Sequence, residues 1–101
     1  MRGFSAVRRI VEGCRRQARG MLKREGFRAH DVAVDMILRG DTYVLKVEVD
    51  GISGRAFFET PMFKAADVEA GLVDEEVIED DIDYCVRAVK KLASRAATGE
   101  E

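Results

Sequence analysis

The sequence predicts an α+β domain in which two long amphipathic helices pack on one face of a three-stranded antiparallel meander. Apolar residues recur at steps of three and four near both ends of the chain and alternate with polar residues in the middle. Gly40-Asp41 and Asp50-Gly51 mark two tight turns between the alternating segments. At 101 residues the chain has the length of one domain. We expect residues 1–97 to form this domain and residues 98–101 to be a frayed tail.

The first helix is predicted to begin near residue 4 and to end at Gly26, a residue suited to the left-handed position after a helix. Its apolar stripe covers an arc of about 120° on a helical wheel. The residues of this stripe are Phe4, Val7, Ile10, Val11, Cys14, Ala18, Met21 and Leu22. The basic residues outside the stripe are Arg8, Arg9, Arg15, Arg16, Arg19, Lys23 and Arg24.

These basic residues divide the charge of the chain. Residues 1–28 carry nine basic and two acidic side chains, whereas residues 67–101 carry four basic and eleven acidic ones. Arginine binds phosphate and carboxylate groups through a bidentate fork, so the helix face suits nucleic acid or an acidic protein surface. A solvated face, or one paired within the chain, is the third interpretation.

Two hairpins are predicted from the alternation and the turn residues. Gly40-Asp41 suits a type II′ turn, and this register pairs Leu38 with Tyr43 and Val32 with Val49. Asp50-Gly51 suits a type I′ turn that leads into a third strand over residues 52–60.

This register also predicts an apolar row on the face of the sheet away from the helices. The row consists of Ile37, Val44 and Phe57, one residue from each strand. An apolar row on an outer sheet face indicates either a cover or a contact. We therefore consider cover by residues 61–73, a homo-oligomer interface, and a platform for a ligand or nucleic acid.

Two further helices are predicted after the meander. Thr60 as N-cap, Pro61 at the first helical position and Gly71 after the end predict a short helix. A long helix from about residue 75 to residue 97 follows, with Asp74 as its N-cap. Its apolar stripe is Ile78, Ile82, Cys85, Val89, Leu92 and Ala96. Acidic residues at its start and basic residues at its end complement the helix dipole.

No spacing in the sequence indicates catalytic, metal or cofactor chemistry. Two cysteines and one histidine are too few for a zinc site, and His30-Asp31 is more typical of a loop surface than of a base with its orienting acid. Cys14 and Cys85 lie on apolar faces, where a thiol behaves as a small hydrophobe. Their alternative role is a disulfide between the two helices. We expect no enzymatic activity, no cofactor, no metal and no small-molecule substrate.

The order of one helix, three antiparallel strands and a second helix is similar to that of double-stranded RNA-binding domains. Residues 44–58 resemble the central hairpin of that family. Those domains hold phosphates with a lysine cluster at the start of their final helix, where this sequence has Asp74, Glu75, Glu76, Glu79 and Asp80. The resemblance therefore implies an order of elements and does not extend to the family's mode of RNA binding.

We expect a cytoplasmic interaction module that is homodimeric or a subunit of a larger assembly. No apolar run approaches the ~20 residues of a membrane span, and the N-terminal residues lack the apolar segment of a secretory signal. The alternative function is an accessory protein that contacts RNA or DNA through the basic face of the first helix. Salt dependence distinguishes the two, because nucleic-acid binding weakens steeply with ionic strength.

Overall fold

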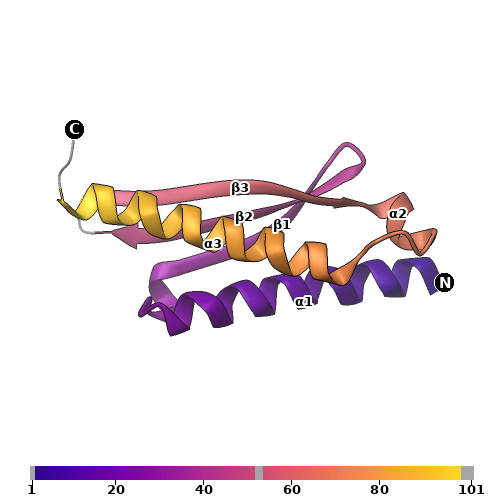
Figure 1. Cartoon of the computed structure of the whole chain (residues 1–101), viewed down its shortest axis with the longest axis horizontal. Coiled ribbons are helices and arrows are strands. Elements are labelled where there is room, and N and C mark those ends of the chain that lie inside the picture. The colour runs from indigo at the N-terminus through magenta and orange to yellow at the C-terminus, as the bar shows by residue number, and fades with distance from the viewer. Residues whose placement is uncertain (1, 52–53, 99–101) are drawn as a thin grey trace.

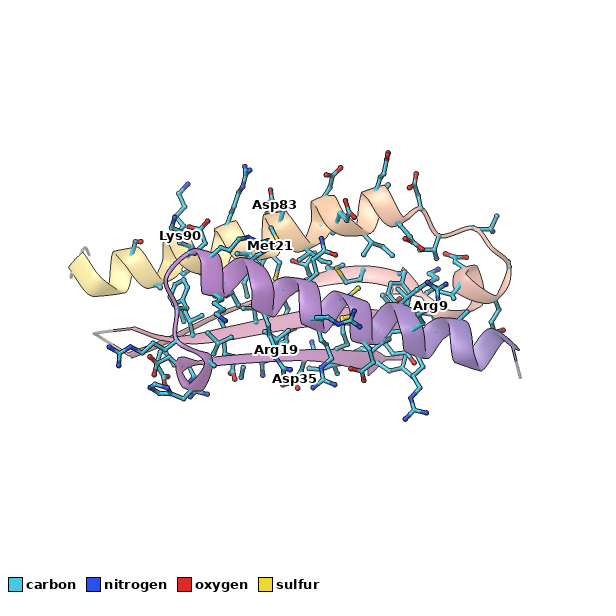
Figure 2. The ribbon with its side chains drawn as sticks, turned by 90° about the horizontal axis from the view of Figure 1, so that it is seen from below. Arg9, Arg19, Met21, Asp35, Asp83 and Lys90 are labelled. Atoms are coloured by element: carbon cyan, nitrogen blue, oxygen red, sulfur yellow. The ribbon has the colours of Figure 1, made fainter. Side chains whose placement is uncertain are left out.

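The computed structural model describes residues 2–51 and 54–98 and contains the predicted elements in the predicted order (Figure 1). The elements are α1 (Arg2–Arg24), a 3-10 turn (Ala29–Asp31), β1 (Val32–Arg39), β2 (Thr42–Gly51), β3 (Gly54–Lys64), α2 (Ala65–Glu69) and α3 (Glu75–Thr98). The strands form one antiparallel sheet in the order β1-β2-β3, so β1 and β3 are its edges. Both long helices lie side by side on one face, with α1 toward β1 and α3 over β2 and β3 (Figures 1 and 2). The α+β fold class is confirmed.

The helix α1 ends at the glycine that the sequence predicts. Gly26 has a φ of 98°, and the N–H of Phe27 donates to the carbonyl oxygen of Leu22 at 3.1 Å, which ends α1 in a Schellman motif. This motif turns the chain back toward β1. Lys90 of α3 forms an ion pair with Glu25 beside the same turn, and this hydrogen bond and charge lower the pKa of Glu25. The C-terminal end of α1 is thereby joined to α3.

The first hairpin has the predicted register. Leu38 pairs with Tyr43 and Val32 pairs with Val49. Gly40 has a φ of 64°, and Asp41 after it has no positive φ, since no residue other than glycine has one in the described part of the chain. A type II′ turn requires a positive φ at its first central residue only. The alternating residues on one face of both strands therefore point to the helices, as predicted.

The second hairpin differs from the prediction. Gly51 pairs with Gly54 and Val49 pairs with Ala56, so the reversal occurs two residues later than a turn at positions 50 and 51 would place it. A turn at positions 50 and 51 would place Ile52 opposite Val49, but Ile52 and Ser53 lie outside the described residues, as do residues 99–101 of the predicted tail. Because β3 moves by an even number of residues, its side chains keep their predicted faces. Ala56 is buried against the core, but Gly54 is exposed.

The third strand is also longer than predicted and displaces the start of the short helix. β3 continues through Lys64, with Val44 opposite Pro61 and Tyr43 opposite Phe63. Met62 is therefore the extra residue of a β-bulge, and both Met62 and Phe63 are buried in the core. Proline is tolerated here because β3 is an edge strand. The prediction that Thr60 and Pro61 begin a helix is wrong, since α2 begins at residue 65.

The C-terminal end of α2 and the start of α3 agree with the prediction. Gly71 has a φ of 72°, and the N–H of Leu72 donates to the carbonyl oxygen of Asp67 at 2.8 Å. The carboxylate of Asp74 accepts a hydrogen bond from the N–H of Glu76 at 2.9 Å, so Asp74 is the N-cap of α3.

One core lies between the sheet and the two long helices. Its most completely buried side chains are Leu22, Leu45, Ile82, Val34, Val47, Val49, Val89 and Cys85. Cys14 and Cys85 are both buried and unbonded. The buried stripe of α3 is shifted from the predicted one, because Val86 and Ala93 are buried whereas Leu92 is 37% exposed. Phe4 and Ala96 were also predicted to belong to the apolar stripes, but they are not among the residues whose side chains the structure describes.

Candidate functional site

The basic face of α1 lies on the surface, as its position outside the apolar stripe predicts. We use this name for Arg8, Arg9, Arg15, Arg16, Arg19, Lys23 and Arg24. Six of these side chains are exposed, and Arg15 is half-buried with 32% of its side chain accessible. Figure 2 shows Arg19 projecting on the β1 side of α1, toward the strand that carries Asp35.

Few of these cations have an acidic partner. Arg9 lies 3.9 Å from Glu75 of α3, and Arg15 lies 3.5 Å from Glu12 of the same helix. The remaining five have no carboxylate within 4.0 Å among the residues that the structure describes; they are Arg8, Arg16, Arg19, Lys23 and Arg24. Elsewhere most basic side chains are paired with acids, namely Arg39, Lys46, Arg55, Lys64, Arg87 and Lys90. The basic face is therefore the main uncompensated positive surface of the described chain.

Four cations of this face follow one flank of α1. Arg8, Arg15, Arg19 and Lys23 are separated by seven, four and four residues, so they lie along the same side of the helix. At 1.5 Å per residue this row is about 22 Å long. Arg9 and Arg24 lie on the opposite flank, which faces α3.

A groove of about 730 Å³ opens at the C-terminal end of this row. Arg19, Lys23, Arg28 and His30 supply its polar side chains, and Gly20, Phe27, Ala29 and Val32 supply the rest of its lining. Phe27 and Val32 are half-buried and pack against the core, so the apolar part of the groove is fixed in place. His30 is 74% exposed at the rim, 3.6 Å from the carboxylate of Asp31.

The sequence alone does not identify this groove. Phe27 and Arg28 follow the predicted end of α1, and only the turn after Gly26 brings them beside the last two turns of the helix. The one available signal is the apolar residue after the C-terminal glycine, because a Schellman motif commonly packs that residue against the helix.

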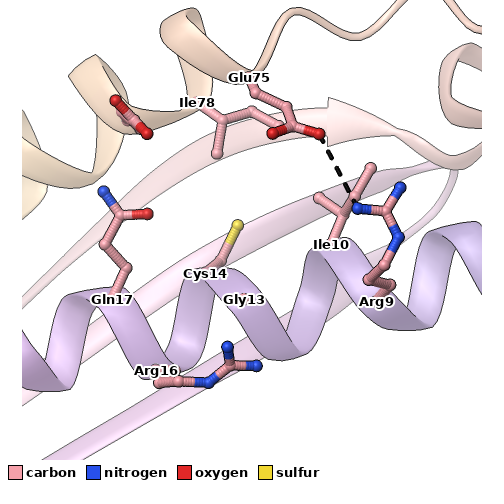
Figure 3. Close-up of a pocket in the computed structure, with 9 residues that line it drawn as sticks. Arg9, Ile10, Gly13, Cys14, Arg16, Gln17, Glu75 and Ile78 are labelled. Atoms are coloured by element: carbon pink, nitrogen blue, oxygen red, sulfur yellow. Dashed lines mark ion pairs between the residues drawn. The ribbon is translucent and has the colours of Figure 1, made fainter.

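A second and smaller groove, of about 270 Å³, lies between α1 and α3. Figure 3 shows Arg9 of α1 reaching across it to Glu75 of α3, with Ile78 beside Glu75 on α3 and with Cys14 and Gln17 on α1. Burial raises the pKa of Cys14 to about 11, so its thiol is protonated at neutral pH and is a poor nucleophile. This groove therefore combines opposite charges over an inert thiol.

The predicted apolar row on the outer sheet face does not form. Ile37 and Val44 are paired, but Phe57 lies opposite Glu48 and not opposite Val44. Because the turn comes two residues later, each residue of β2 meets a β3 residue four positions further along the chain. Val44 therefore lies opposite Pro61. Phe57 is 54% exposed, and the ammonium group of Lys46 lies 5.6 Å from the centre of its ring.

Residues 61–73 do not cover the outer face, although that was one of the predicted arrangements. Met62, Phe63 and Val68 all belong to the core on the helix side of the sheet. Val44 is nevertheless only 8% exposed. Ion pairs between neighbouring strands occupy this face, and the pair of Arg39 with Glu59 passes over β2.

Three exposed apolar side chains of α3 form a flank beside β3. They are Val77, Tyr84 and Leu92, with exposed fractions of 52%, 60% and 37%. The ring of Tyr84 meets that of Phe58 of β3 edge to face, with centroids 5.7 Å apart. Of these three residues only Leu92 was predicted to be buried in the stripe of the last helix, and its exposure shows that this prediction is wrong.

The fold and these surfaces define a small α+β protein with two helices on one side of a three-stranded meander. No protein family, characterised protein or solved structure matches the chain in comparisons of sequence and of structure. Within residues 2–51 and 54–98, no cluster of three or more His, Cys, Asp or Glu side chains could hold a metal ion. In the same residues, no helix is long and apolar enough to cross a lipid bilayer.

Proposed function

We propose that the chain is a non-enzymatic binding module that contacts single-stranded nucleic acid through the basic face of α1 and the adjoining groove. The observation that carries this proposal is the absence of acidic partners for five of the seven cations, within the described residues. Cations paired inside a protein have little charge to offer a ligand. Those of α1 stay available, whereas most others are used in ion pairs.

The arrangement of the cations supports an extended anion. A row of about 22 Å on one helix flank can contact several phosphates of one strand in succession. A compact anion would need cations that converge on one point. Each contacted phosphate releases condensed counterions, which gives such a row affinity without sequence preference.

The groove supports a single strand over a duplex. Exposed bases can enter a lining that contains Phe27 and Val32 while Arg19 and Lys23 hold the adjacent phosphates. A duplex keeps its bases paired and stacked inside, so it cannot offer them to this lining.

The test is fluorescence anisotropy of the full chain with a labelled 15-nucleotide oligouridine. If the four cations of the row and Arg28 of the groove each contact one phosphate, affinity should fall about 100-fold between 50 and 200 mM salt. Arg19→Glu and Lys23→Glu should each weaken binding by about tenfold at 50 mM salt, as reversal of one contacting charge implies. Lys64→Glu is the matched control, because Lys64 is exposed and lies outside the basic face.

Two results would overturn the proposal. One is the lack of binding to the oligonucleotide at 50 mM salt, and the other is an equal loss of binding in the control variant. Tighter binding to a duplex of the same length would contradict the single-strand proposal and would show that the ligand is a duplex. Binding to polyglutamate in the absence of oligonucleotide binding would assign the basic face to an acidic protein surface.

A further inference from the structure

We infer that two copies of this chain form a symmetric dimer by antiparallel pairing of β3 with β3, with the twofold axis at Phe57. The three-stranded sheets of the two copies would become one sheet of six strands, and the two α3 helices would pack against each other on its helix side. This interface is separate from the basic face of α1.

The free edge of β3 makes such pairing available. β3 has 11 residues and pairs with β2 along one side only, so the backbone groups on its other side face outward. An exposed edge of this length is a template for another strand unless charges or a proline block it. Pro61 lies near its C-terminal end, which leaves the segment before it open to pairing.

The outward side chains of β3 are complementary to themselves. Arg55, Phe57 and Glu59 alternate on the outer face, with opposite charges on either side of the aromatic ring. Antiparallel pairing about the central residue places Phe57 opposite Phe57 of the second copy. It also places each Arg55 opposite a Glu59, and both kinds of cross-strand pair are favourable.

The ion pairs already present on this face leave room for the new ones. Arg55 donates through Nε to Asp50 at 2.9 Å and through Nη1 to Glu48 at 3.3 Å, and these bonds raise its pKa. Among the described residues, its Nη2 has no acceptor. A carboxylate can accept about four hydrogen bonds, so Glu59 can hold Arg39 and a second arginine together.

The exposed flank of α3 is also complementary to a second copy of itself in antiparallel orientation. If two α3 helices pack antiparallel about Tyr84, Val77 of one copy meets Leu92 of the other, because the two residues lie seven before and eight after the centre. The acidic first half of each helix would also meet the basic second half of its partner. All three apolar residues are exposed in the single chain.

The two patterns share one axis, and this agreement carries the inference. The ring of Tyr84 packs on Phe58, next to the strand centre, and the thiol of Cys85 donates to the carbonyl oxygen of Phe58 at 3.7 Å. The centre of the strand pattern and the centre of the helix pattern therefore lie side by side. Since α3 lies over β2 and β3, the strand pairing would bring the two α3 axes to about 10 Å, a normal helix-packing distance.

Sedimentation velocity of the full chain tests the dimer. We expect a dimer for the wild-type chain at micromolar concentrations. Tyr84→Asp should raise the dissociation constant by at least about 100-fold, because a central aromatic residue is replaced in both copies. Leu72→Asp is the matched control, since Leu72 is 73% exposed and belongs to the loop before α3, not to the three residues of the flank. Circular dichroism verifies that both variants fold.

A cross-link tests the axis itself. Opposite residues in an antiparallel pair have Cα atoms about 4.5–5.5 Å apart, which is within disulfide range. Phe57→Cys should therefore give a disulfide-linked dimer on mild oxidation, whereas Asp35→Cys, on the exposed face of β1, should stay monomeric under denaturing conditions without reductant. A monomeric wild-type chain at 100 µM, or equal cross-linking of the two variants, would overturn the inference.

Discussion

Arg39 on β1 donates two hydrogen bonds to Glu59 on β3, at 2.8 and 2.9 Å, across the intervening strand β2. Arg39 lies opposite Thr42 and Glu59 lies opposite Lys46, so this ion pair crosses β2 diagonally above Val44. The crossing accounts for the burial of Val44 on a face that carries no helix. The outer face is covered in part by the sheet's own charges.

The first prediction concerns this ion pair. Arg39→Gln should lower the free energy of unfolding by about 0.5–1 kcal/mol, because a bidentate pair that is partly exposed is stronger than a simple surface pair but is screened by solvent. Urea denaturation at low and high salt measures the loss, which should shrink as salt increases. Lys64→Gln removes an exposed contact of 3.9 Å and should have no measurable effect. An equal loss in both variants would contradict the special role of Arg39.

The second prediction concerns a buried hydroxyl. Thr60 is 7% exposed, and its Oγ1 has no hydrogen-bond partner among the described residues. The thiol of Cys85 lies beside it, but a thiol is a weak hydrogen-bonding group and this one donates to the carbonyl oxygen of Phe58. Thr60→Val should therefore raise the free energy of unfolding by about 1 kcal/mol.

Thr60→Ser is the matched control for that experiment. It keeps the hydroxyl and deletes the methyl group, so it should lower the free energy of unfolding by about 1 kcal/mol. Thermal or urea denaturation of the three proteins gives the order Val, Thr, Ser. A valine variant less stable than the wild type would show that the hydroxyl is satisfied.

Local signals in the sequence predict most of this fold correctly. The first hairpin has one glycine-containing turn between two alternating segments, so only one register satisfies both the turn and the pattern. The second hairpin offers two glycines, Gly51 and Gly54, whose alternative turns place the same residues on the same faces. Alternation could not distinguish them, and the apolar row at Phe57 depended on that choice.

The surfaces were harder to predict than the elements. Pro61 is typical both of a helix start and of an edge strand, and the sequence does not say which strand is at the edge. The groove beside Phe27 and the flank around Tyr84 each join residues from separate elements. The basic face of α1 was predictable because a single helix carries it.

The third prediction compares two glycines of opposite effect. Gly26 has a φ of 98°, so Gly26→Ala should lower the free energy of unfolding by about 1–2 kcal/mol. Gly13 lies inside α1, and a Cβ atom there would meet nothing within 4 Å. Gly13→Ala should therefore raise the free energy of unfolding by about 1 kcal/mol. Urea denaturation of both variants measures the two effects, and a shift of the same sign in both would contradict this account of α1.

The fourth prediction is a pH dependence that arises from Cys14. Burial raises the pKa of this thiol from 9.0 to about 11 in the folded chain. Between these values the unfolded chain loses the thiol proton while the folded chain keeps it. The unfolded state then binds fewer protons, so the free energy of unfolding falls as pH rises. This contribution is fully retained below about pH 9 and is lost progressively toward pH 11, by up to about 2–3 kcal/mol.

Urea denaturation of the wild type and Cys14→Ala at several pH values between 8 and 11 measures this effect. Other groups titrate in the same range in both proteins, so the difference between the two curves isolates Cys14. The wild type should be the more stable protein at pH 8, because the alanine leaves a small cavity. Its advantage should shrink above pH 9 and can reverse near pH 11. Parallel curves would mean that solvent reaches Cys14, and Ellman's reagent would then label the folded chain at pH 8.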